Sequence, residues 1–284
     1  MKLAFSILIL GIAISFSSIS ANAGPEEDWN ACKADEGFDY AIADAGIAAC
    51  SRLIKSTKEK TDLASAFANR CRHYETRLKM ELAQPDCERA IQLDRHNALA
   101  FLVRGKVRFW KTNKYSKKSI EDFTTSIELN PTIAEAYYWR ALSYGALGQC
   151  NLAIQDWSLY IKFKPDEAEA YKSRHECYYQ LGMYDLALRD MKQAIKLEPK
   201  NSHYLLDISR IYLVYGDPTE GLSYIETAIQ LSPDNGIFYE GRGVLKEKLG
   251  KREEALADYK KALQHDNSNR GIAERLKARG ISID

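Results

Sequence analysis

Apolar residues recur along this chain at spacings of three, four and seven, first over one short stretch and then again over the next. In residues 134–167 these positions are Tyr137, Ala141 and Tyr144, followed by Ala153, Trp157 and Tyr160. Such spacings place the apolar side chains on one face of an α-helix. Gly148 separates the two stretches, where a residue in the left-handed conformation would end the first helix. The segment therefore predicts two helices joined by a short turn.

The same pattern returns at a fixed interval. Pro131, Pro165, Pro199 and Pro233 stand 34 residues apart, and each closes a similar phrase beginning with isoleucine. Proline disfavours helix in the residue before it, so each of these prolines ends a second helix. A fixed period of this length indicates a stack of identical units, in which each unit contacts mainly its neighbours and the stack offers an extended surface.

These columns resemble the tetratricopeptide repeat (TPR). The resemblance covers six units, at 64–97, 98–133, 134–167, 168–201, 202–235 and 236–269, with Arg95 and Asn267 replacing the closing proline in the first and last. It implies an all-α fold, a right-handed superhelical solenoid of helix–turn–helix units. Residues 24–63 are expected to hold one extra helix, from Tyr40 to Lys55, with Trp29–Gly37 as a loop or single turn. Residues 270–284 are expected to form a capping helix and tail.

The first 23 residues have the pattern of a secretory signal peptide. A basic start at Lys2 precedes an apolar run, and Ala21-Asn22-Ala23 fits a cleavage site, so we expect cleavage after Ala23. The alternative is a membrane anchor, but the run is short for a span and no basic cluster follows it. The phrase Ile47–Ile54 also resembles exported bacterial members of the family. The sequence thus predicts a periplasmic or secreted protein whose mature chain does not insert into a membrane.

Charge limits the class of partner. The whole chain carries 40 basic and 39 acidic residues. Without Lys2 the two signs balance, and they are interspersed. Nucleic acids and anionic membranes select a basic face, so we expect neither as the main partner.

The cysteine count is six, and export would place these residues in an oxidising compartment. The repeat pattern favours pairing between neighbours in sequence: Cys32 with Cys50, Cys71 with Cys87, and Cys150 with Cys177. The alternative is a set of buried free thiols, which are common in helical cores.

Two charged columns accompany the repeats. Their members are Arg70, Arg104, Arg140, Arg174 and Arg242 in the first helices, and Asp86, Asp122, Asp156, Asp190 and Asp258 in the second. Both charges are missing from one unit, where Ile208 and Tyr224 stand instead. Their joint loss favours structural pairing within each repeat, because one partner alone would be a stranded charge. The alternative is a basic ladder that binds an anionic ligand.

Catalytic and metal-binding motifs are absent from the sequence. No two of the five histidines are three or four residues apart, and no Cys-x-x-Cys, Gly-x-Ser-x-Gly or phosphate-binding loop occurs. We therefore expect no catalytic residues, no metal and no cofactor, and a protein that is not an enzyme.

The resemblance instead implies partner binding on a concave face lined by first-helix residues outside the packing columns. The candidates are Arg72, Lys106, Phe109, Tyr138, Lys172, Tyr179, Leu206 and Arg210. Apolar anchors beside single charges are typical of a groove for a peptide or protein segment. The sequence thus predicts a non-catalytic scaffold or adaptor of the cell envelope with a protein partner. The alternative is a structural repeat protein that self-assembles into oligomers without a groove ligand.

Overall fold

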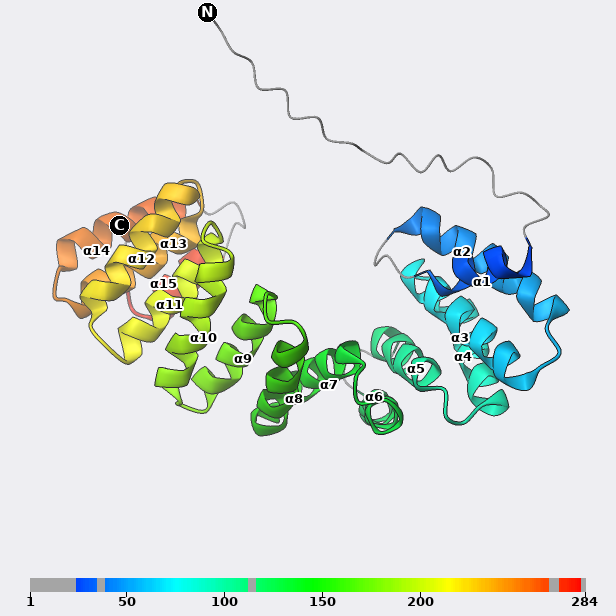
Figure 1. Cartoon of the computed structure of the whole chain (residues 1–284). Helices are drawn as coiled ribbons and strands as arrows, with labels where there is room; N and C mark the ends of the chain where they lie inside the picture. Colours follow the sequence, from blue (N-terminus) through cyan, green and yellow to red (C-terminus); the bar gives the residue numbers. More distant parts are fainter. Residues whose placement is uncertain (1–23, 35–38, 112–115, 266–270, 282–284) are drawn as a thin grey trace, which may run out of the picture. The chain divides into compact units, whose positions relative to one another are not determined.

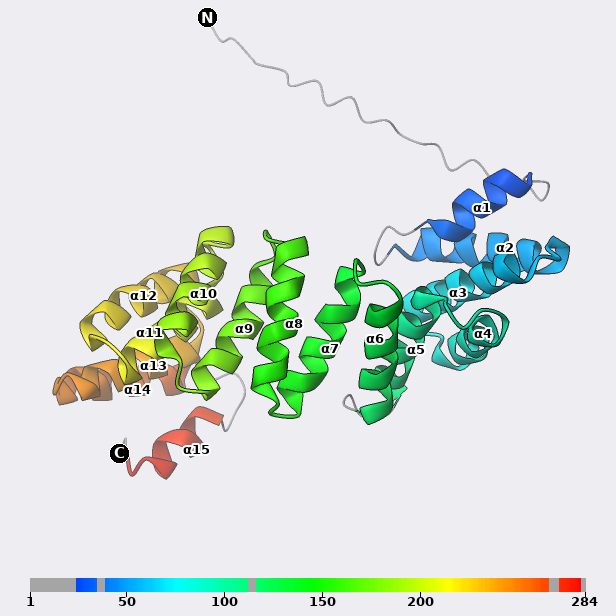
Figure 2. The same cartoon turned by 60° about the horizontal axis from the view of Figure 1, so that its bottom comes forward.

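A computed structural model describes residues 24–34, 39–111, 116–265 and 271–281 (Figures 1 and 2). The expected signal peptide lies outside the described residues. Within the described residues the chain forms fifteen α-helices and no strand, which confirms the all-α class. The chain divides into two compact units, Met1–Val107 and Arg108–Asp284, and each is described here by itself.

The N-terminal unit is a series of helices that pack on their neighbours in sequence: α1 on α2, α2 on α3 and α3 on α4. Their bounds are α1 Pro25–Lys33, α2 Tyr40–Ser56, α3 Lys60–Thr76 and α4 Met80–Leu93. Helix α5, Ala98–Lys111, begins in this unit and its last four residues belong to the next.

Residues 24–63 hold two whole helices where one was expected, and α3 already begins at Lys60. The loop expected at Trp29–Gly37 is wrong over its first part. Helix α1 lacks a clear apolar period, but its ends suit a helix. Pro25 stands in the first turn together with Glu26, Glu27 and Asp28, and Lys33 lies in the last turn. Proline and acidic residues both favour a helix N-terminus. Helix α1 therefore pairs with α2 as a further helical hairpin.

The C-terminal unit continues with helix pairs packed in chain order, α7 on α8 through α13 on α14. Their bounds are α6 Lys117–Leu129, α7 Ala134–Ala146, α8 Cys150–Phe163, α9 Ala168–Gln180, α10 Tyr184–Leu197, α11 Ser202–Val214, α12 Pro218–Leu231, α13 Gly236–Lys248, α14 Arg252–Gln264 and α15 Gly271–Ala278. Each expected unit from 134 onward thus holds one helix pair. Helix α15 follows the last pair and buries Ile272 and Leu276 in the core of α11–α14.

In four of the repeats the turn between the two helices contains a left-handed residue, whereas Gly216 in the repeat at 202–235 has φ of +138°. Gly148, Gly182 and Gly250 have φ of +71°, +71° and +76°, where an L side chain would be strained. In the first repeat Leu78 takes this place with φ of +55°. The glycine column in the sequence therefore marks the true end of three first helices.

Small residues allow the paired helices to approach. Ala141 and Ala153 are fully buried beside Trp157, and a Cβ added to Gly243 would overlap the Tyr259 ring. The alternation of small and large columns in the sequence is thus a packing pattern. Of the helices in the described ranges, none is both long and apolar enough to cross a membrane.

Candidate functional site

Buried Arg–Asp pairs connect the two helices of most repeats. Arginine Nε and Nη2 each donate to one aspartate oxygen, at 2.6–2.9 Å, in the pairs Arg70–Asp86, Arg140–Asp156, Arg174–Asp190 and Arg242–Asp258. The aspartate side chains are 4–10% exposed. Such two-point contacts fix the relative position of the helices. The four arginines are committed to these contacts, so the structural interpretation accounts for them.

We call these four pairs the Arg–Asp ladder. Its arginines also contact aromatic rings, and Arg70, Arg140 and Arg174 contact the preceding helix. The Arg174 guanidinium lies 5.8 Å from the ring centroids of both Tyr171 and Tyr178. Its Nη1 donates to Ser158 Oγ of helix α8 at 3.0 Å. Arg140 and Arg70 repeat the second contact with Thr124 and Ser51. The ladder therefore joins successive helix pairs as well as the helices within one pair.

The repeat at 202–235 replaces this whole arrangement with apolar contacts. Ile208 is fully buried, and Tyr224 stacks on Tyr212 with ring centroids 5.7 Å apart. The preceding helix α10 has Lys192 at the position that Ser158 occupies on α8. The Lys192 Nζ lies 6.0 Å from the centroid of the Tyr212 ring. Three polar positions have changed together, so no charged group is stranded.

Sequence reasoning missed two further basic residues that bond aspartates of the charged columns. Arg108 Nη1 donates to Asp122 at 2.6 Å, and Lys246 Nζ lies 2.8 Å from Asp258. Both residues stand in a column that is otherwise aromatic. This departure from the column was the signal in the sequence that could have identified them. Burial alone would raise the pKa of Asp258, but the hydrogen bonds from Arg242 and Lys246 outweigh it and lower that pKa. The expected pairing of Arg104 with Asp122 stays a prediction.

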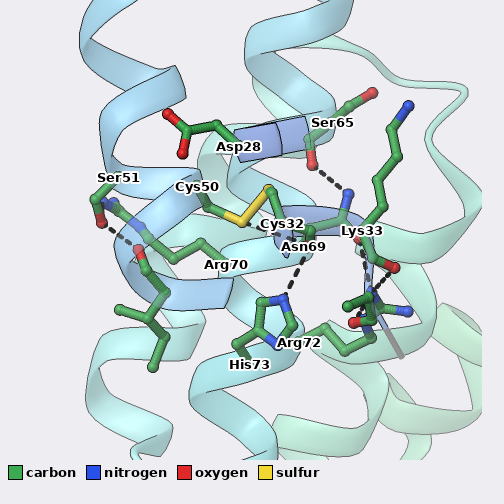
Figure 3. Close-up of a disulfide and its surroundings, with 12 residues drawn as sticks. Asp28, Cys32, Lys33, Cys50, Ser51, Ser65, Asn69, Arg70, Arg72 and His73 are labelled. Atoms are coloured by element: carbon green, nitrogen blue, oxygen red, sulfur yellow. Dashed lines mark hydrogen bonds between the residues drawn. A yellow bond between two sulfur atoms is a disulfide. The ribbon is translucent and has the colours of Figure 1, made fainter. Parts of the chain in front are cut away.

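Two of the three expected cysteine pairs form disulfides. Cys32–Cys50 joins α1 to α2, and Cys71–Cys87 joins α3 to α4, with Cα atoms 4.9 and 5.5 Å apart. Figure 3 shows the first of them with the buried His73, whose Nε2 lies 2.9 Å from the Cys32 carbonyl oxygen. Each of the two N-terminal hairpins is therefore closed by a covalent bond.

The third expected pair differs. Cys150 and Cys177 are buried but not bonded. Cys150 begins helix α8, and its thiol donates to Gln180 Oε1 at 3.2 Å. Each formed disulfide closes a single hairpin, whereas this one would have joined two repeats. Burial, and secondly the hydrogen bond with Cys150, raise the pKa of Cys177 to about 12.

Four of the eight predicted groove residues serve packing instead. Arg72 Nη2 donates to the carbonyl oxygens of Lys33 and Ala34 at 3.0 and 3.1 Å, which holds the end of α1 (Figure 3). Lys106, Phe109 and Leu206 are 9%, 5% and 3% exposed. Spacing places a residue on a helix face but does not show whether a neighbouring segment covers it, and here segments do.

Tyr138 and Lys172 lie at the surface but have neighbours of their own. Tyr138 is half-buried against Trp139, Trp157 and Tyr160, with ring centroids 5.3–5.5 Å apart. Lys172 Nζ lies 2.8 Å from Glu176 and 3.6 Å from Glu169. Lys172 is therefore not the isolated basic residue that the sequence suggested.

Tyr179 and Arg210 line two adjoining depressions. One has a volume of about 260 Å³ and is lined by His175, Glu176, Tyr179, Gln180, Asp207 and Arg210. The other, of about 340 Å³, is lined by Ser209, Arg210, Leu213, Ile237, Glu240, Gly241, Val244, Leu245 and Arg275. Apart from Arg275 on α15, these residues come from α9, α11 and α13. We call the surface that the helices α7, α9, α11 and α13 share the first-helix face.

Helix α15 and the residue that follows it contact α13 through two arginines that sequence reasoning did not single out. Arg275 donates to both carboxylate oxygens of Glu240 at 2.6–3.2 Å, and Arg279 Nη2 donates to Glu247 at 2.6 Å. The first-helix face thus accepts basic side chains in this structure. Among the described residues, no group of three or more His, Cys, Asp or Glu could hold a metal ion.

Comparison with known proteins gives two kinds of match. The tetratricopeptide repeat family model matches residues 177–235 and 206–271. A search of curated proteins finds no match.

Solved structures with the same fold are numerous. The C-terminal part of a TPR repeat-containing protein from Cytophaga hutchinsonii has a TM-score of 0.61 at 18% identity, and the match covers 84% of this chain and 99% of that part. YrrB, described as a TPR protein with an unusual peptide-binding site, has a TM-score of 0.57 at 17% identity and covers 68% of this chain and 97% of its own. MamA from Desulfovibrio magneticus RS-1, solved from residue 41 to its end, has a TM-score of 0.55 at 16% identity, and the match covers 62% of this chain and 97% of that structure.

At identities this low, the solved structures show that the fold is alike and no more. The family match shows in addition that the tetratricopeptide repeat is present. Both agree with the helix pairs and their 34-residue period. The chain therefore contains tetratricopeptide repeats, matched by the family model between residues 177 and 271, and has the fold of tetratricopeptide-repeat proteins.

Proposed function

We propose that this protein is a non-catalytic scaffold of the cell envelope that binds a protein or peptide segment on its first-helix face. The observation that carries the proposal is the pair of adjoining depressions on α9, α11 and α13, which share Arg210. One has Leu213, Ile237 and Val244 in its lining, and the other is lined by polar and charged residues together with Tyr179. Apolar anchor sites beside charged groups are typical of protein recognition surfaces.

The proposal also accounts for the fold around the depressions. The Arg–Asp ladder engages its own side chains within the helix pairs, whereas the depressions on the first-helix face are open to a partner. YrrB, which shares the fold, is described as having a peptide-binding site. We assign peptide or protein binding to this chain on that support together with its own depressions.

Export to the envelope is the second part of the proposal. It rests on the cleavage pattern at Ala21–Ala23 and on the two disulfides, which form and persist in oxidising compartments. Intact-mass analysis after expression of the full chain in a Gram-negative bacterium checks it. We expect a periplasmic chain beginning at Gly24 with two disulfides and two thiols. An uncleaved chain, or six thiols, contradicts the proposal.

Binding is tested with a random twelve-residue peptide library displayed on phage and selected on residues 24–284. We expect a selected peptide, measured by fluorescence anisotropy, to lose roughly tenfold or more of its affinity for Arg210→Glu or Ile237→Asp, in line with loss of an interface anchor. Arg189→Glu on α10 and Leu152→Asp on α8 are matched controls, because both residues are exposed on second helices.

Two outcomes argue against this proposal. Equal binding by all four variants, with unchanged thermal unfolding, removes the depressions as the site. Concentration-dependent assembly of the parent chain in light scattering, without any selected peptide, supports the self-assembling alternative.

A further inference from the structure

The larger of the two depressions, of about 340 Å³, is built partly by a helix outside the repeats. Most of its lining comes from α11 and α13, and Arg275 of α15 completes it. Helix α15 has apolar anchors of its own, because Ile272 and Leu276 are buried in the core of α11–α14. Arg275 therefore acts on the depression from a helix that other side chains hold in place.

Arg275 neutralises the carboxylate in this lining, which belongs to Glu240. The Arg275 Nε donates to Glu240 Oε1 at 2.9 Å and to Oε2 at 3.2 Å, and its Nη2 donates to Oε2 at 2.6 Å. The Glu240 side chain is 12% exposed and the Arg275 side chain 50%. Two-point contacts of this kind are strong, and a carboxylate this buried is costly to leave without a cation. The ion pair therefore cancels the negative charge at the depression.

The other polar side chains of the lining are engaged as well. Arg210 Nη1 donates to Asp207 Oδ1 at 3.1 Å, and Ser209 Oγ donates to the Leu206 carbonyl oxygen at 2.6 Å. The apolar side chains of the lining are Leu213, Ile237, Val244 and Leu245. Because its charges are paired, the depression offers apolar contact and attracts neither an acid nor a base.

An acidic residue at position 240 is not a requirement of the repeat. Leu206 stands 34 residues earlier, in the equivalent position, and is 3% exposed. The ladder aspartates bond arginines of their own helix pair, such as Arg242 with Asp258, whereas Glu240 bonds an arginine outside the repeats. The neutral state of the depression thus depends on α15.

We propose that Arg275 is a specificity-determining residue of the first-helix face: by holding Glu240, it makes the larger depression take an uncharged apolar side chain of the partner in place of a basic one. This inference rests on the proposed function and specifies the residue that the depression accepts. A charged side chain entering the lining would lose its hydration without gaining an opposite charge. Without the Arg275 guanidinium, the Glu240 carboxylate would accept a charge-assisted hydrogen bond from a lysine or arginine of the partner.

The test selects the same phage library in parallel on residues 24–284 of the parent chain and of Arg275→Gln. Peptides selected on the parent should be enriched in Leu, Ile, Met or Phe and should depend on Ile237. Peptides selected on Arg275→Gln should gain Lys or Arg. The best of these should bind the parent roughly tenfold or more weakly at low salt, because the parent has no open carboxylate for them.

Two further variants separate the charge from the fold. Glu240→Gln/Arg275→Gln removes both partners, so it should regain the preference of the parent for apolar peptides. Arg275→Lys keeps a cation beside Glu240 and should also select as the parent does. Thermal unfolding of each variant shows whether α15 remains in place.

Arg279→Gln is the matched control. Arg279 follows α15 and bonds Glu247 at 2.6 Å, and both residues line a separate depression of about 330 Å³. Its replacement should leave the selected peptides unchanged.

The outcomes distinguish this inference from the proposed function. Equal selection by Arg275→Gln and the parent, or a gain of basic residues with Arg279→Gln, Arg275→Lys or the double variant, overturns the inference. The proposed function then stands, provided that binding still depends on Arg210 and Ile237. Failure of the parent to select any peptide overturns both.

Discussion

In residues 24–107, two disulfides each close a helical hairpin, whereas the described residues of 108–281 contain no disulfide and hold their helices by ion pairs and aromatic packing. The N-terminal unit also uses buried polar contacts of its own, such as Lys106 with Glu75 at 2.9 Å. The C-terminal unit instead buries Trp157, Met191, Phe238 and Tyr259. The same repeat can therefore be stabilised with a disulfide or by ion pairs and packing without one.

The difference has a physical reason. A disulfide stabilises mainly by restricting the unfolded chain. It is most useful where the hairpin has a small apolar core, as α1 and α2 do with Cys32, Ala49, Cys50 and Leu53. Between α11 and α14 the core is large and continuous and includes α15. Four predictions test this contrast, from the largest expected effect to the smallest.

Removing both disulfides should have the largest effect. The variant Cys32→Ala/Cys50→Ala/Cys71→Ala/Cys87→Ala opens loops with sequence separations of 18 and 16 residues, and each is worth about 3 kcal/mol of unfolding free energy. Hydrogen exchange read by mass spectrometry should show the loss of protection in α1–α4 and not in α9–α14. Treating the parent with a reductant should reproduce the pattern. A loss spread evenly over both units would contradict the contrast.

Breaking one ladder pair should cost somewhat less. Asp156→Ala leaves Arg140 without its main partner in a largely buried position, so we expect about 3 kcal/mol lower stability against urea. The exposed Asp166→Ala serves as control and should change stability by less than about 0.5 kcal/mol. The double variant Arg140→Ile/Asp156→Tyr, which copies residues 208 and 224, should recover part of the loss. Strictly additive single effects in this cycle would show that the two residues do not act as a pair.

Cys150→Ala should have a modest effect, because no covalent bond is lost. Removing one buried sulfur leaves a small cavity and should cost about 1 kcal/mol. Thermal unfolding with and without reductant measures it, and the difference from the parent should be the same in both. A loss that disappears in reductant would show that Cys150 and Cys177 are bonded in solution.

The smallest effect should come from pH. Burial lowers the pKa of His175 below its usual 6.5, against the opposing charge of Asp207. The unfolded chain then binds more protons than the folded one, so stability should fall as pH drops below about 6.5. Urea midpoints at neutral and mildly acidic pH should differ less for His175→Gln than for the parent. An unchanged difference in that variant would assign the pH dependence to other groups.

The sequence predicted the repeats better than the surfaces. The joint absence of Arg and Asp in one repeat predicted the ladder, because a buried charge and its partner must be lost together. Helix α1 was missed because Cys32 is its one fully buried apolar residue, too few to form a period. Its contact with Arg72 crosses 38 residues or more of sequence, and no local pattern encodes such a contact.

Exposure within a column was the other limit. Phe109 and Tyr179 occupy equivalent positions, yet Phe109 is buried against Trp139 while Tyr179 lines a depression. The repeat pattern gives both residues the same face, and the neighbouring side chains decide which one a partner can reach. Arg108 and Lys246 show the same limit. The sequence shows that a basic residue replaces an aromatic one, but the aspartate that it contacts is known only from the structure.

Arg70, Arg140 and Arg174 each donate to a hydroxyl of the preceding helix, and this contact bears on how such a chain can lengthen. Repeat 134–167 carries a complete set: Arg140 meets Thr124 before it, and its own Ser158 receives Arg174 after it. A tandem copy of these 34 residues would place a new Arg140 against Ser158 and leave every junction satisfied. Repeat 168–201 has Lys192 at the position equivalent to Ser158. In a tandem copy of this repeat, Lys192 would face the arginine of the added copy. Duplication of repeat 134–167 therefore preserves the contact between arginine and hydroxyl, whereas duplication of repeat 168–201 places two basic residues together.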